Sequence, residues 1–281
     1  MRPLRYSPLI ALAAVSLMPH AAGATDATAA PPAAPAAPSA DSLVISANGS
    51  TLTDATGGGG GSLTWLHDFT SGSLGVGGEY QRLADTHWAF GSLSGSVSTG
   101  SANDKWTFSA DGHLGRGDTD TPVGVHHFDY QVEGAGVSGT FGGKVTLQLE
   151  GRQYDIDTTH GTLPKAGIGV LWSPHWQTTV SYARSVGGNL GTEMEMLRLD
   201  HYGATVNWLL GGAAGHVAPS IVNIYTGATG PAPQLREGYL GISRGFGRSD
   251  WSILGDYLKV AGERRITLTV ICTLHGRSSA S

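Results

Sequence analysis

The sequence predicts an all-β fold: a closed antiparallel, up-and-down barrel of about fourteen strands that crosses a membrane. Three observations predict this fold. Short segments alternate apolar and polar residues, charged residues make up only 14% of the chain, and glycine is abundant at 43 residues. Soluble globular proteins carry about 25% charged residues, so low charge combined with period-two patterning favours strands with one face in lipid.

The first 24 residues have the three parts of a secretory signal peptide. Arg2 and Arg5 supply a positive start, residues 9–18 are an apolar stretch, and Ala22 to Ala24 offers small residues for cleavage. Residues 25–41 are rich in Ala and Pro, which predicts a disordered spacer. We therefore expect Sec-type export and cleavage near Ala24.

The barrel itself is expected over residues 42–275, with 276–281 as a C-terminal tail. The expected strands lie at 43–53, 58–69, 72–83, 87–99, 104–115, 124–136, 143–153, 164–173, 176–186, 195–209, 216–226, 237–246, 250–259 and 265–275. A tilted strand of about 9–11 residues crosses the bilayer core. An even count lets the two end strands pair, which leaves no open edge in lipid. Twelve strands also remain open, because the segments at 43–53 and 216–226 and the Gly-rich stretch 134–143 have the weakest patterns.

Individual segments have two distinct faces. In the last one, Ile266, Leu268 and Cys272 oppose Arg265 and Thr267. We expect the apolar face, including Cys272, to meet lipid and the polar face to line the lumen, because Arg or Lys facing lipid at mid-bilayer costs about 2–4 kcal/mol. The lumen-lining candidates are Glu79, Asp111, Asp129, Glu133, Lys144, Glu150, Arg152, Lys165, Arg184, Arg198, Arg244 and Asp256.

Tryptophans near the ends of these segments predict an interfacial aromatic girdle. The girdle candidates are Trp65, Trp88, Trp106, Trp172, Trp176, Trp208 and Trp251.

Glycine and proline clusters predict the connections between strands. Tight turns are expected at 141–143, 187–189 and 211–212, and the glycine run at 57–61 is interpreted as a flexible turn. Residues 118–122 and 226–233 are expected to be longer loops.

Sequence motifs for chemistry give no positive prediction. The stretch Gly91 to Gly95 has Leu93 where a nucleophile elbow needs serine, and no zinc-protease or phosphate-loop pattern occurs. His126 and His127 are adjacent and point to opposite faces of a strand, whereas His113, His127 and His201 are expected near the lumen acids Asp111, Asp129 and Asp200. We therefore predict no catalytic residues, no metal and no cofactor, and favour a protein that is not an enzyme.

The signal peptide, the spacer and the repeated amphipathic segments over 43–275 resemble the Gram-negative outer-membrane β-barrel class. Residues 238–270 (GYLGISRGFGRSDWSILGDYLKVAGERRITLTV) are similar to barrels of the YaiO type and to the barrels of polysaccharide exporters. The resemblance implies an outer-membrane location, contact with outer-membrane lipid and lipopolysaccharide, and insertion by the barrel-assembly machinery. The chain departs from the class where the last strand ends at Leu274 and His275, since the class commonly ends on an aromatic residue.

The function expected from these features is a small channel, or an accessory to solute or polysaccharide export, with a small solute or a glycan as partner. An outer-membrane barrel enzyme acting on lipid or lipopolysaccharide and a soluble secreted β-sandwich binding protein are the alternatives. No cluster of Lys and Arg occurs, so no nucleic-acid partner is expected.

Overall fold

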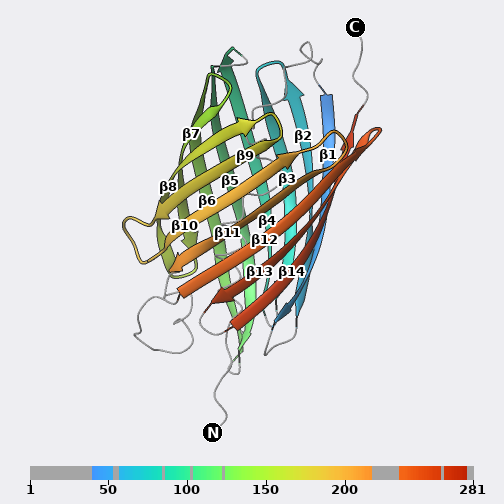
Figure 1. The fold of residues 1–281 in the computed structure, drawn as a ribbon. Coiled ribbons are helices and arrows are strands. Elements are labelled where there is room, and N and C mark those ends of the chain that lie inside the picture. Colours follow the sequence, from blue (N-terminus) through green and yellow to red (C-terminus); the bar gives the residue numbers. More distant parts are fainter. Residues whose placement is uncertain are drawn as a thin grey trace.

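The structure, a computed structural model, describes residues 40–52, 57–83, 86–101, 104–121, 124–216, 234–260 and 263–276. In these ranges fourteen antiparallel strands pair in sequence order, and β1 pairs with β14 to close the barrel (Figure 1). The strands are β1 (Ala40–Leu52), β2 (Gly58–Phe69), β3 (Gly72–Leu83), β4 (Thr86–Gly100), β5 (Lys105–Thr121), β6 (Gly124–Phe141), β7 (Val145–Ile156), β8 (Thr159–Ser173), β9 (Trp176–Arg184), β10 (Glu193–Tyr202), β11 (Asn207–His216), β12 (Gln234–Phe246), β13 (Ser249–Val260) and β14 (Glu263–His275).

The predicted closed barrel of about fourteen strands is confirmed. A β-sandwich has two separate sheets with edges, and the described strands form one closed sheet, so the sandwich alternative is wrong. Across the same residues, no helix has the length and apolar character needed to span a membrane. The predicted signal peptide lies outside the described residues, as does the predicted spacer up to residue 39. The spacer prediction is wrong for residues 40 and 41, which begin β1.

The two ends of the barrel differ in their connections. Ser42 pairs with His275, so β1 begins and β14 ends at the same end, which we call the terminal end. Its connections are 70–71, 101–104, 142–144, 174–175, 203–206 and 247–248, all short. The opposite, distal end has the two longest connections, 185–192 and 217–233. Bacterial barrels of this kind have short periplasmic turns and longer extracellular loops, so this asymmetry predicts that the distal end faces outward.

Two predicted strands are placed differently by the structure. The expected strand 195–209 covers most of β10, a turn at 203–206 and the first residues of β11. Of the expected strand 216–226, residues 217–226 lie outside the described residues. The predicted turn at 211–212 is wrong, because both glycines lie inside β11. A Cβ at Gly211 would lie 2.3 Å from the Tyr239 ring, so this glycine makes room for a neighbouring side chain.

Of the other turn and loop predictions made from glycine and proline clusters, some are confirmed and some are wrong. Gly142, Gly143, Gly187 and Gly188 adopt positive φ in connections, as turns require. The predicted flexible turn at 57–61 is wrong from residue 58 onward, where β2 begins. The predicted loop at 118–122 is also wrong, because β5 continues to Thr121; the predicted loop 226–233 lies outside the described residues.

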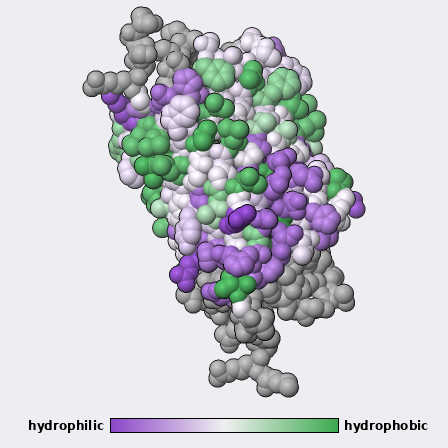
Figure 2. Space-filling model, turned by 180° about the vertical axis from the view of Figure 1, so that it is seen from behind, coloured by the Kyte–Doolittle hydropathy of each residue, from purple (hydrophilic) through white to green (hydrophobic). Residues whose placement is uncertain are grey.

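The outer surface has an apolar band with aromatic borders. Leucines such as Leu63, Leu93 and Leu240 are more than half exposed on it. Trp65, Trp106, Trp172 and Trp251 are exposed near the terminal end, where Trp176 packs against both Trp172 and Trp208. Tyr80, Tyr182 and Tyr257 are exposed closer to the distal end. Green side chains lie mainly over the upper part of the face in Figure 2 and a purple patch lies lower down. This is the surface expected of a barrel that sits in a bilayer.

Trp88 is the exception among the predicted girdle residues, because its side chain points inward and is only 3% exposed. Cys272 lies where the sequence predicts it, on the outer face between the exposed Ile45 and Trp251 of the neighbouring strands.

The polarity of the strands inverts part of the way along the barrel. On β6, Phe141 is exposed on the outer face near the terminal end, whereas Phe128, Tyr130 and Val132 are buried on the inner face near the distal end. The same inversion occurs on β4, where Trp88 and Phe90 point inward but Leu93 and Val97 point outward.

We call the resulting group of inward apolar side chains, which come from β4, β6 to β13 and the connection 185–192, the distal collar. Its larger members form one cluster: Trp88, Phe90, Phe128, Tyr130, Val132, Tyr154, Ile156, Leu163, Leu190, Met194, Leu235 and Leu258.

Candidate functional site: the barrel interior

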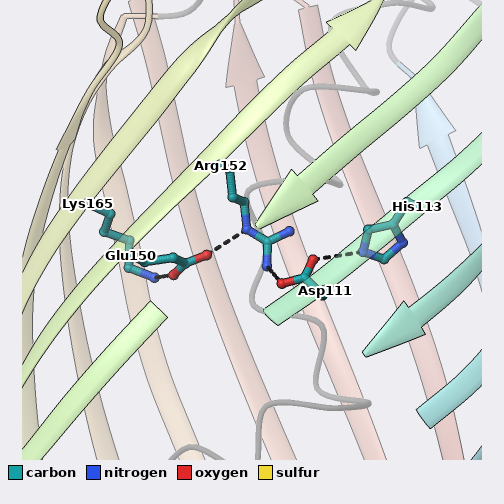
Figure 3. A network of polar contacts seen from close by, with 5 residues as sticks. All are labelled: Asp111, His113, Glu150, Arg152 and Lys165. Carbon is teal, nitrogen blue, oxygen red and sulfur yellow. Dashed lines mark hydrogen bonds and ion pairs between the residues drawn. The ribbon is translucent and has the colours of Figure 1, made fainter. Parts of the chain in front are cut away.

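A row of linked charges crosses the inner face of β5, β7 and β8 (Figure 3). Lys165 Nζ lies 3.1 Å from Glu150 Oε2, and Arg152 Nε donates to Glu150 Oε1 at 2.6 Å. Arg152 Nη2 reaches Asp111 Oδ1 at 3.1 Å, and His113 Nε2 lies 3.1 Å from Asp111 Oδ2. We call these five residues the charge ladder.

Strand alternation and register explain why these residues meet. Glu150 and Arg152 are two positions apart on β7 and so share a face, and Lys165 is paired directly with Glu150. Arg152 must cross β6 to reach Asp111, and the residue between them in register is Gly134. A Cβ at Gly134 would lie 2.7 Å from Asp111 Oδ1 and 3.3 Å from Arg152 Cγ, so the missing side chain opens the path for this ion pair.

Replacing Gly134 with valine is expected to separate Arg152 from Asp111, because the new side chain occupies the space between them. In a double-mutant cycle, the coupling free energy of Asp111 and Arg152 should fall from about 1 kcal/mol, the upper range for accessible ion pairs, to near zero. Unfolding measured in lipid vesicles checks this. Gly151→Val on β7 is the control, since no atom lies within 4 Å of a Cβ at Gly151. An unchanged coupling in Gly134→Val would contradict the expectation.

The charge ladder is accessible to water inside the barrel. The side chains of Asp111, Arg152, Glu150 and Lys165 are between 23% and 30% exposed. Carboxylates and cations alternate along the row, so the wall presents both signs within a few ångströms. Such a wall can contact polar solutes of either charge without strong preference.

Further charges lie on other parts of the inner wall. Arg198 and Asp200 pair on β10, with Nη2 to Oδ1 at 2.7 Å. On β12 to β14, Glu237 and Arg265 are both in register with Leu258, and Asp256 lies one inward position along β13. The polar interior is therefore distributed around the barrel.

The lumen-lining candidates are not all inside. Glu79, Asp111, Glu150, Arg152, Lys165, Arg198 and Asp256 lie on the inner face. Asp129, Glu133, Arg184 and Arg244 lie on the outer face, and Lys144 lies in the turn before β7. Asp129 is 87% exposed and pairs with Arg116 of β5 at 3.3 Å.

The physical reason is the polarity inversion. Asp129, Glu133 and Arg184 belong to the distal parts of their strands, where the apolar residues point into the collar and the polar ones into outer solvent. Arg244 lies toward the terminal end, with its guanidinium 4.8 Å from the Phe246 ring centroid.

The histidines are also divided between the two faces. His113 faces the lumen beside Asp111 as expected. The predictions for His127 and His201 are wrong: His127 pairs with Asp118 on the outer face, and His201 stacks on Trp208 with ring centroids 5.3 Å apart. Among the described residues, no three His, Cys, Asp or Glu side chains come together as a metal site would require.

Sequence reasoning missed the interior Glu237 and the enabling Gly134, whereas Asp200 and Arg265 lie on the inner face as expected. Strand alternation did offer a signal for Glu237, because its neighbour Arg236 must point the other way. Gly134 gave no signal, since its role depends on which strands are neighbours.

Comparisons with known proteins give a fold and no family. No family model matches the chain, and no curated protein matches it. Among solved structures, the chain is similar to the CymD monoaromatic hydrocarbon channel, with a TM-score of 0.57 and 11% identity over 85% of this chain and 88% of that one. It is also similar to a TodX deltaS2S3 mutant monoaromatic hydrocarbon channel, with a TM-score of 0.56 and 8% identity over 86% and 91% of the two chains. The TodX toluene transporter of Pseudomonas putida has a TM-score of 0.50 and 8% identity over 86% and 90%.

At these identities the likeness concerns the fold. The YaiO-type resemblance, polysaccharide export and the lipid-directed enzyme stay predictions from the sequence. The fold of the chain is that of outer-membrane barrel channels.

Proposed function

We propose that this protein is an outer-membrane channel for small solutes. The proposal rests on the contrast between the two faces of one closed sheet. The outer face has an apolar band with aromatic borders, and the inner face has linked charges that water can reach. Channels of similar fold carry small molecules according to their names, CymD and TodX among them. The predicted signal peptide supports export to the outer membrane.

The mixed charge of the inner wall determines the ion selectivity that we expect of the channel. Arg152 and Lys165 are each within hydrogen-bonding distance of a carboxylate, so neither sign dominates this wall. A pore lined in this way is expected to discriminate weakly between small anions and cations.

Planar-bilayer recording of the detergent-purified, folded protein tests the proposal. Stepwise conductance increases in KCl are expected, whereas the same protein unfolded by boiling should give none. Folding is verified independently by the different gel mobility of boiled and unboiled samples. A folded, inserted barrel that gives no conductance and admits no small sugar in liposome-swelling assays would refute the channel.

A further inference from the structure

The connection 185–192, between β9 and β10, is fixed against the start of β8. Val186 and Thr162 exchange backbone hydrogen bonds of 2.8 and 3.2 Å. Asn189 donates from its backbone to His160 O at 2.9 Å, and its side chain bonds His160 N and Thr158 O, each at 2.8 Å. Positive φ at Gly187, Gly188 and Gly191 allows the chain to bend through this path. The connection is therefore an ordered part of the distal end.

This connection places Leu190 inside the barrel. Gly161 is an inner-face position of β8, and a Cβ there would lie only 2.9 Å from Leu190 Cβ. Leu190 is 4% exposed and belongs to the distal collar together with Leu163 and Met194. Val186, in the same connection, is 56% exposed. One residue of the connection thus completes the collar, and another stays in outer solvent.

The collar and the charge ladder follow one another along the barrel. On β7, the collar residues Tyr154 and Ile156 come directly after the ladder residues Glu150 and Arg152 on the inner face. A solute that enters at the distal end meets the collar before the charge ladder, and the collar is apolar except on β12 and β14, where Glu237 and Arg265 lie in register with the collar residue Leu258. Hydrated ions lose favourable water contacts in an apolar constriction, and such constrictions lose their own water readily. A solute with an apolar surface has no such cost.

We propose that the distal collar, completed by Leu190, selects small uncharged solutes with an apolar surface over hydrated ions. This inference rests on the proposed channel function and adds the class of solute. The charge ladder then contacts the polar part of a solute that has passed the collar.

Three variants in the one connection test the inference. Leu190→Gln keeps the approximate volume and adds polar atoms, so single-channel conductance in KCl should rise at least twofold. The liposome-swelling rate for phenyl glucoside relative to methyl glucoside should fall at least twofold, because the collar no longer favours the phenyl ring. Leu190→Ala widens the collar and should raise conductance and both swelling rates. Val186→Ala is the matched control and should change nothing.

The outcomes separate the inference from the function on which it rests. If neither Leu190→Gln nor Leu190→Ala alters the conductance measured for the wild type, the collar is not the selective element. The proposed channel function is unaffected by that result. Absence of both conductance and sugar uptake in the folded wild type refutes the channel itself. Gel mobility before and after boiling shows whether each variant is folded; if Leu190→Gln does not fold, Leu190→Ala decides alone, and an unaltered conductance in it overturns the inference.

Discussion

Leu240→Arg is expected to lower the free energy of unfolding by about 2–4 kcal/mol, the range for a cation on the lipid face at mid-bilayer. Leu240 is 51% exposed on the outer face of β12 and pairs with Leu210 of β11 and Gly255 of β13. On the same face of the same strand, Arg236 lies toward the distal end and Arg244 toward the terminal end. These two natural arginines bracket the apolar band, and Leu240 lies midway between them. Reversible unfolding in lipid vesicles, followed by tryptophan fluorescence, gives the measurement.

Leu274→Arg is the matched control for depth. Leu274 is 42% exposed on the outer face of β14 and pairs with Ser249, the first residue of β13, at the terminal end. The cost of an outward arginine falls to about 0–1 kcal/mol near the interface. Equal losses in the two variants would mean that the apolar band does not sit in the hydrocarbon core, and the membrane placement would then be wrong.

Period-two alternation correctly predicts the faces of the strands wherever a strand lies within the apolar band. Leu147 and Leu149 of β7 are outside and Glu150 and Arg152 are inside, as expected. The errors at Trp88 and Asp129 come from one assumption, that the apolar face meets lipid along the whole strand. The change in which face of the strand is apolar is visible in the sequence of β6. Its apolar residues occupy even positions from Phe128 to Val132 and odd positions from Ala135 to Phe141, while the backbone alternation continues unbroken.

The contacts that form the site depend on information a single sequence does not contain. The residues of the charge ladder were identifiable as polar inward positions, but their pairing depends on the registers of β5 to β8. Lys165 contacts Glu150 because those two residues are opposite in the β7–β8 register. The position of Leu190 depends on the hydrogen bonds of a non-repetitive connection to β8, for which alternation has no rule.

Arg152→Met is expected to make the channel prefer cations. The substitution keeps an apolar stem but removes the charge that contacts both Asp111 and Glu150. Lys165 still contacts Glu150, whereas Asp111 keeps only the His113 imidazole among its ladder contacts. The interaction between two unit charges about 4 Å apart in water is worth about 1 kcal/mol. This energy corresponds to a roughly fivefold change in an equilibrium constant. The cation-to-anion permeability ratio, measured from the reversal potential in a KCl gradient, should rise by up to this factor.

Arg116→Met separates a lumen effect from a general change of charge. Arg116 is on β5, as Asp111 is, but it lies on the outer face, where it is 89% exposed and pairs with Asp129. Both variants change the protein's net charge equally, so a response to overall charge would appear in both. Because permeating ions contact the inner wall and are screened from the outer one by the sheet and by salt, only Arg152→Met should shift the reversal potential. Equal shifts would place the conducting path outside the charge ladder, and the ladder would then be a structural feature of the wall.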